Sequence, residues 1–295
     1  MSNLISIGQI IDQTIERYRT NFKELFGIAL WVLVAFIPLS VASFLNPAEG
    51  VELPASREIF LWLFNGASVL AVTIVSLWVG ISLILAIDQA EGGKKIDAHA
   101  VGKQAWKLFV PFALVSVLIG LILTCLALLS LPGLLLMVFG TLNSQDTLGT
   151  IGLLLFVLGA IASIIFMLKL SIELAFTQYS FLLNTKGKAL SWTAMKTALR
   201  ESRSLVRGRW WATFFRLALP NIIFSLVVFG VNYILSLGAG VLLAVNAGSL
   251  SETLIKAGAV FISLAVIAVN VLAMPLYSIA TYKIYDSLTR SRGRG

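Results

Sequence analysis

The sequence predicts an all-α polytopic membrane protein, with six transmembrane helices and amphipathic interfacial helices on the cytoplasmic surface. Hydrophobic residues make up 58% of the 295 residues, charged residues only 12%, and the mean hydropathy is +0.94. These values lie outside the range of soluble globular domains. The apolar runs are also repeatedly long enough to cross a bilayer, which takes about 20 residues per helix. The whole chain, residues 1–295, therefore reads as one integral membrane domain.

Residues 6–20 predict a helix that lies on the membrane surface, because apolar residues recur at three- and four-residue steps with charged residues between them. Ser6 and Gln9 fit a capping box at its start, and Asn21 and Glu24 fit a second one. The second box favours a new helix from Asn21, while one continuous helix into the membrane fits equally. No basic region precedes an apolar one, so we expect no cleavable signal peptide.

The apolar runs predict six spans and two further surface helices. The spans cover residues 26–45, 59–87, 110–131, 151–176, 211–245 and 254–282, and the surface helices cover 97–106 and 188–207. Asp97 is the expected N-cap of the second surface helix, and Pro111 falls in the first turn of the third span, where a missing N–H costs little. Pro132-Gly133 is expected to end that span. Residues 134–142 are too short to cross again and form either an extension or a re-entrant segment.

Basic residues predict the orientation of these spans. Eighteen Lys and Arg residues fall in the loops of one side and two in the loops of the other. Such residues concentrate on the cytoplasmic side, so we expect both termini in the cytoplasm. The net charge of +8 has the same explanation, and no segment resembles a nucleic-acid-binding module.

Three segments that begin outward-going spans resemble one another. They read NFKELFGIAL over 21–30, AWKLFVPFAL over 105–114 and RWWATFFRLA over 209–218. With Phe22, Trp106 and Trp210 aligned, the first two share a following lysine, whereas the third matches only in aromatic and apolar character. This suggests three repeats of a surface helix plus a membrane hairpin. The ordinary composition of membrane interfaces explains the similarity as well.

The densest basic segment runs from Lys186 to Trp211 and predicts an interfacial helix. Its candidate contacts to anionic lipid are Lys196, Arg200, Arg203, Arg207, Arg209, Trp210 and Trp211. The first four form a stripe beside an apolar face of Trp192, Met195, Leu199 and Val206, with Ser202 on the same face. Such a helix contacts acyl chains and headgroups together, and each cation contributes roughly 1 kcal/mol near an anionic surface. Alternatively, the segment is a positive loop that sets topology and has no specific ligand.

Polar residues inside the spans are the usual indicators of transport. Asn221 and Asn270 are the candidates here, although asparagine more often joins helices than binds substrate. Lys169 and Glu173, four residues apart, are expected to form a pair near the interface, and Arg216 is expected to reach the headgroups. No acidic residue lies securely at mid-membrane, which argues against a proton-coupled transporter.

The sequence offers no catalytic set. The single histidine, His99, lies in a polar loop without further ligands at metal-like spacing, and Cys125 is the single cysteine. Phosphate-binding loops and nucleophile elbows are not found. We therefore expect no catalytic, cofactor-binding or metal-binding residues.

Three segments resemble one family. They are AMKTALRESRSLVRGRWWATFF over 194–215, IGQIIDQTIERYRTNFKELFGIAL over 7–30 and LYSIATYKIYDSLTRSRG over 276–293. Together they resemble the glycerophosphoryl diester phosphodiesterase membrane-domain family and its uncharacterised bacterial inner-membrane relatives. The resemblance implies a multi-helix membrane domain of unsettled function. The catalytic barrel that follows this domain in some relatives is not expected here, and neither is phosphodiesterase activity.

The sequence therefore predicts a non-enzymatic inner-membrane protein that organises lipids or protein partners through a basic cytoplasmic face. Its expected partners are membrane lipids with anionic headgroups. The alternative is a small-molecule or lipid transporter, whose path is lined by spans kinked at Pro38, Pro220 and Pro275. A membrane-embedded enzyme is the third hypothesis and the least favoured one.

Overall fold

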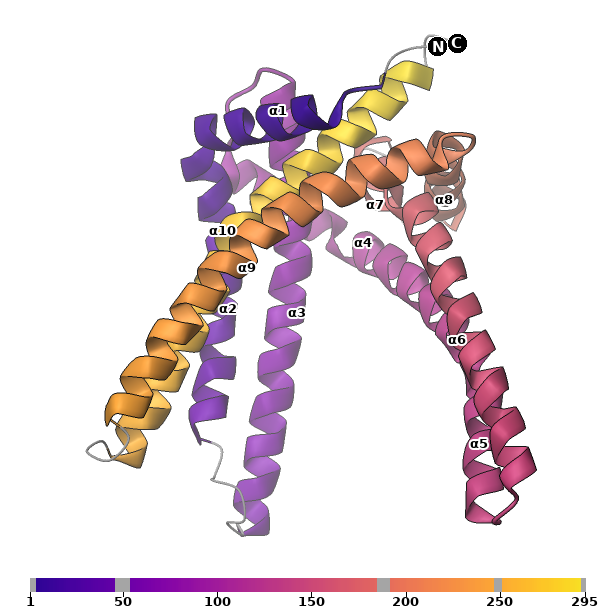
Figure 1. Cartoon of the computed structure of the whole chain (residues 1–295). Helices are drawn as coiled ribbons and strands as arrows, with labels where there is room; N and C mark the ends of the chain where they lie inside the picture. Colours follow the sequence, from indigo (N-terminus) through magenta and orange to yellow (C-terminus); the bar gives the residue numbers. More distant parts are fainter. Residues whose placement is uncertain (1–3, 46–53, 185–191, 247–250, 293–295) are drawn as a thin grey trace. The chain divides into compact units, whose positions relative to one another are not determined.

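The computed structural model describes residues 4–45, 54–184, 192–246 and 251–292. Over these residues the chain forms helices and no strand (Figure 1). Six described helical stretches are long and apolar enough to cross a membrane: Phe22–Ala42, Ala55–Glu91, Ala98–Leu142, Asp146–Asn184, Trp210–Val241 and Leu254–Arg292. The protein is an all-α polytopic membrane protein, as the sequence predicts.

The chain divides into two compact units. The first contains Met1–Phe109 and Phe215–Arg294, and the second contains Val110–Phe214. The helices of the first unit are α1 (Ile7–Thr20), α2 (Phe22–Leu45), α3 (Ala55–Glu91), the first part of α4 (Ala98–Ala127), most of α9 (Trp210–Asn246), and α10 (Glu252–Arg292). Helix α10 packs against α1, α2 and α3. The unbroken run of buried residues from Ile81 to Ile87 lies in α3 and forms part of this core.

Ionic contacts connect three helices of the first unit. The Glu91 carboxylate of α3 accepts hydrogen bonds from Arg17 Nε of α1 at 2.8 Å and from Lys283 Nζ of α10 at 2.7 Å. One turn earlier, Asp88 Oδ1 accepts a hydrogen bond from the Tyr282 hydroxyl at 2.8 Å. The side chains of Glu91 and Lys283 are only 14% and 12% exposed. These contacts therefore join the C-terminal ends of α1 and α3 to α10 around Tyr282 and Lys283.

The N-terminal segment follows the two-helix alternative. Ser6 and Gln9 form the predicted capping box, and α1 ends at Thr20. Asn21 is the C-cap residue of α1, and its Nδ2 donates a hydrogen bond to the Arg17 carbonyl at 3.1 Å. Arg216 Nε donates to the Ile5 carbonyl at 2.8 Å. The guanidinium of Arg216 thus holds the segment before α1, a role that the sequence did not indicate.

The predicted surface helix over 97–106 is wrong as a separate element. Asp97 caps a helix as expected, with Oδ1 accepting from the Ala100 N–H at 3.0 Å, but this helix is α4 and continues to Ala127. Pro111 therefore lies inside α4 and not in its first turn. A single internal proline removes one hydrogen bond, and membrane helices tolerate that loss. A separate short helix precedes the first and third long hairpins but not the second, so the threefold repeat is incomplete.

The last helix also differs from its prediction. The predicted sixth span ends at residue 282, yet α10 continues to Arg292. Leu288, in this continuation, is 2% exposed. Because an apolar residue at this position packs into the core, the helix extends beyond the hydrophobic run.

The second unit contains the rest of α4, a 3-10 turn η1 (Leu128–Ser130), α5 (Leu131–Leu142), α6 (Asp146–Leu174), α7 (Thr177–Asn184) and α8 (Trp192–Val206). Figure 1 shows α5 continuing the course of α4 and α6 returning beside α5. Residues 134–142 are thus an extension of the preceding span, and Pro132-Gly133 does not end the helical path. Residues 188–191 of the third predicted surface helix lie outside the described residues.

Candidate functional site

Helix α8 docks on the break between α6 and α7. Ser202 is completely buried there. Its Oγ donates to the Glu173 carbonyl at 2.6 Å and accepts from the Phe176 N–H at 3.2 Å. Since α6 ends at Leu174 and α7 begins at Thr177, the hydroxyl binds the backbone groups that the break releases. This serine therefore fixes the position of α8 against α6.

The face predicted for α8 packs against the protein only in part, because Trp192 at its start is exposed. The buried residues of α8 are Ala198, Ser202, Leu205 and Val206. Trp192 is 56% exposed, and its ring lies 5.2 Å from Lys196 Nζ in a cation–π contact. Met195 and Leu199 are half-buried. Two of the four buried residues, Ser202 and Val206, therefore belong to the predicted face, and the hydroxyl of Ser202 binds backbone groups at the break between α6 and α7.

A glycine turn connects α8 to α9. Gly208 has φ +78°, a backbone conformation that glycine adopts without steric cost. The Arg209 N–H donates to the Val206 carbonyl at 2.9 Å and closes α8. The next residue, Trp210, begins α9, and its Nε1 donates to the Lys169 carbonyl at 3.3 Å. The turn therefore brings the start of α9 back to α6.

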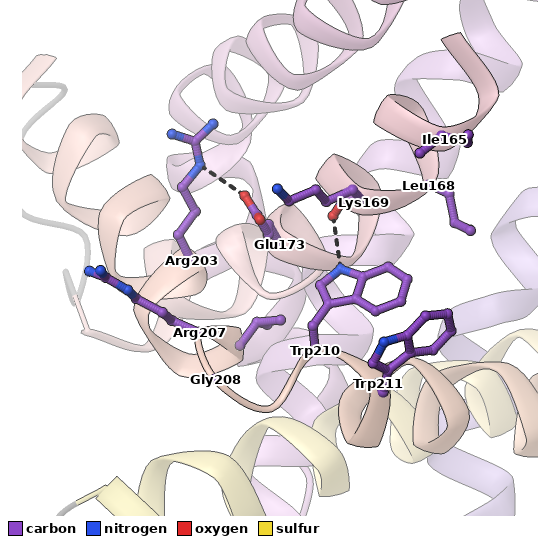
Figure 2. Close-up of a pocket in the computed structure, with 10 residues that line it drawn as sticks. Ile165, Leu168, Lys169, Glu173, Arg203, Arg207, Gly208, Trp210 and Trp211 are labelled. Carbon is purple, nitrogen blue, oxygen red and sulfur yellow. Dashed lines mark hydrogen bonds and ion pairs between the residues drawn. The ribbon is translucent and has the colours of Figure 1, made fainter. Parts of the chain in front are cut away.

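These three elements enclose a cleft of about 780 Å³. Its lining residues are Ile165, Leu168, Lys169 and Glu173 of α6, Arg203 and Val206 of α8, Arg207 and Gly208 of the turn, and Trp210 and Trp211 of α9. Figure 2 shows the indole of Trp210 beside Lys169, with Glu173 and Arg203 on the other side of the lysine. The cleft thus combines a mostly apolar wall with a charged rim.

The rim of the cleft contains more positively charged residues than negatively charged ones. Three cationic residues, Lys169, Arg203 and Arg207, line the cleft together with one acidic residue, Glu173. Arg203 Nε lies 3.7 Å from Glu173 Oε2, with side-chain exposures of 54% and 25%. The ion pair described for Glu173 is thus with Arg203 and not with the predicted partner, Lys169. An excess of cations beside indole rings suits an anionic group attached to an apolar chain.

Four of the seven predicted lipid-contact residues line the cleft: Arg203, Arg207, Trp210 and Trp211. Lys196 and Arg200 are exposed on α8, and Arg209 lies in the turn; these three are not among the lining residues. The α6 side of the cleft was not predicted. Its signal was present in the spacing of Ile165, Leu168, Lys169 and Glu173, which places all four on one helix face.

The two predicted intramembrane asparagines bind their own helices. Asn221 Nδ2 donates to the Leu217 carbonyl at 2.7 Å, and Asn270 Nδ2 donates to the Val266 carbonyl at 2.8 Å. Neither residue lines the cleft or the smaller cavity of about 370 Å³ between α2 and α10. Across the described ranges, no group of three or more His, Cys, Asp or Glu residues is placed to hold a metal ion.

A scan against protein-family models and searches of curated proteins and of solved structures found no match to the chain. The resemblance to the phosphodiesterase membrane-domain family therefore stays a prediction. The cleft itself is the basis for a functional proposal.

Proposed function

We propose that this integral membrane protein is non-enzymatic and organises anionic lipids through the basic side of α8 and the adjoining cleft. The observation that carries the proposal is the cleft, where three cations and two tryptophans meet at the end of an apolar helix. Tryptophan is enriched at the level of lipid headgroups. Arginine binds phosphate groups in a bidentate manner. The two residue types together therefore match the boundary between headgroup and acyl chain.

The same proposal places α8 on the cytoplasmic face of the bacterial inner membrane, with both termini in the cytoplasm. Eighteen Lys and Arg residues on one side against two on the other support this orientation. Anionic lipids of the cytoplasmic leaflet contribute about 1 kcal/mol per nearby cation. Membership of the phosphodiesterase membrane-domain family, without its catalytic activity, is part of the proposal.

The test is the lipid composition around the full chain. The protein is extracted with its surrounding bilayer in polymer nanodiscs, and the lipids are identified by mass spectrometry. Combined Lys196→Gln, Arg200→Gln, Arg203→Gln and Arg207→Gln should lower the enrichment of anionic lipid at least fivefold, the equivalent of about 1 kcal/mol. The matched control removes four charges elsewhere, at Lys94, Lys95, Lys103 and Lys107, and should keep most of the enrichment. Unchanged enrichment in the α8 variant would refute the proposal.

A transporter is the second candidate. Three helices of the first unit contain an internal proline: Pro38 in α2, Pro220 in α9 and Pro275 in α10. Internal prolines can permit bending of a helix around a path. The two candidates are distinguished in proteoliposomes that contain a fluorescent lipid. A quencher is added outside the vesicles, and the fraction of fluorescence that stays protected is measured. Protein-dependent lipid exchange between leaflets favours the transporter, and fluorescence that stays protected favours the organising role.

A further inference from the structure

We propose that the cleft is a discrete site for one phosphate-headed lipid that lacks a headgroup amine. Its phosphate replaces Glu173 as the partner of Arg203, and its acyl chain lies beside Trp210 along α6. This inference rests on the proposed function, because it names the ligand that the basic side of α8 would hold most tightly.

The size of the cleft favours an amphiphile over a bare anion. Ligand sites commonly have volumes of about 300–1,000 Å³, and the cleft measures about 780 Å³. Four charged residues line one part of it, while isoleucine, leucine, valine and two tryptophans line the rest. A free phosphate would use the charged part only and would leave the apolar wall uncovered.

An apolar stripe leads from the cleft along α6. It consists of Leu154, Leu158, Ile161, Ile165 and Leu168, and each of these residues is between 44% and 64% exposed. Steps of four, three, four and three residues place these side chains on one face of the helix. The last two members also line the cleft. The stripe therefore gives an acyl chain a continuous apolar surface that begins at the charged rim.

The charged rim explains the preference for a phosphate. At 3.7 Å the contact between Arg203 and Glu173 is longer than a charge-assisted hydrogen bond, which spans about 2.7–2.9 Å. The carboxylate is therefore a loose partner that a phosphate could replace. Lys169 and Arg207 would add attraction to the phosphate and would repel an ammonium group on the same lipid. Phosphatidic acid and phosphatidylglycerol satisfy both conditions, whereas phosphatidylcholine does not.

The aromatic wall is held in place before any ligand arrives. The Trp210 ring donates to the Lys169 carbonyl, stacks on Phe214 at 5.4 Å and meets Trp211 edge to face at 4.7 Å. A wall that is already ordered loses less conformational entropy when a ligand binds.

The experiment is native mass spectrometry of the full chain in detergent, titrated with phosphatidic acid, with phosphatidylcholine of the same acyl chains, and with glycerol 3-phosphate. The proposal predicts one saturable phosphatidic acid adduct, at least tenfold tighter than phosphatidylcholine or glycerol 3-phosphate. Arg203→Gln should weaken it at least tenfold. Glu173→Gln should tighten it about fivefold, because the competing carboxylate is removed. Misfolding would not produce tighter binding, so Glu173→Gln keeps the test valid if another variant is unstable.

Lys103→Gln is the control, since it removes one exposed cation of α4 outside the cleft. It should leave the phosphatidic acid affinity within twofold. Equal effects of Lys103→Gln and Arg203→Gln, or adducts that accumulate without saturation, would overturn the proposal. Glycerol 3-phosphate binding as tight as phosphatidic acid would also overturn it, in favour of a free-phosphate site. If the nanodisc enrichment depends on α8 but no saturable adduct forms, the cleft proposal fails and the proposed function stands.

Discussion

Gly152→Ala tests how closely α5 and α6 approach. Gly152 lies in α6, where an added Cβ would be 2.2 Å from the Met137 backbone nitrogen of α5. Cβ contacts in proteins become ordinary at 3.4 Å, so the two helix backbones would have to separate by about 1.2 Å. Glycine at such a position lets the backbones of membrane helices meet.

The size of the effect follows from two opposing terms. Overpacking a well-packed interface costs about 1–3 kcal/mol, while alanine gains about 0.8–1 kcal/mol of helix propensity over glycine. Gly149→Ala is the matched control one turn earlier in the same helix. Its added Cβ would lie no closer than 3.8 Å to any neighbour. The control receives the same propensity gain, so the difference between the two variants measures the overpacking cost.

The assay is thermal unfolding of both full-length variants in the same detergent. We expect Gly152→Ala to be less stable than Gly149→Ala by about 1–3 kcal/mol. Equal stability of the two variants would show that α5 and α6 do not meet at this separation, and the reasoning would be refuted.

Three further substitutions test the cleft and the ionic cluster. Ser202→Ala leaves two backbone groups at the break between α6 and α7 without their hydroxyl partner and should cost about 1–3 kcal/mol in thermal unfolding. The control Thr197→Ala, whose exposed hydroxyl binds the Thr193 carbonyl of the same helix, should cost under about 0.5 kcal/mol. Gly208→Ala forces a side chain into a positive φ, with an expected loss of about 1–2 kcal/mol in the same assay; Gly208→Asn should lose less, and an equal loss would contradict the turn. Glu91→Gln removes the carboxylate shared by two cations and should cost about 1.5–3 kcal/mol in chemical denaturation, against under about 0.5 kcal/mol for Asp286→Asn at the exposed pair with Arg290.

Much of the fold was predictable because its signals are local. The six spans depend on the length and hydropathy of contiguous runs, and the caps at Ser6 and Asp97 depend on side chains within three residues of the backbone groups they bind. The errors concern continuity. The polar composition near residues 106 and 282 suggested that a helix ends at each position. The backbone hydrogen bonds of α4 and α10 continue through both positions, so each helix is longer than predicted.

The candidate site was predictable only in part. Arg203, Arg207, Trp210 and Trp211 belong to one contiguous basic and aromatic segment, so composition identified them.

The sequence by itself determined the class of the protein, its six apolar helices and the basic and aromatic residues of one functional segment. The mean hydropathy and the net charge of a segment are calculated from contiguous residues, so both can be obtained from the sequence alone. Only the tertiary structure decided that Ser202 is buried, that Glu173 pairs with Arg203, and that Trp210 binds the backbone of Lys169. These contacts join residues 29 to 41 positions apart. The position at which α8 docks determines which residues make these contacts. A buried hydroxyl such as that of Ser202 needs a hydrogen-bond partner, whereas an apolar side chain needs only to be removed from water.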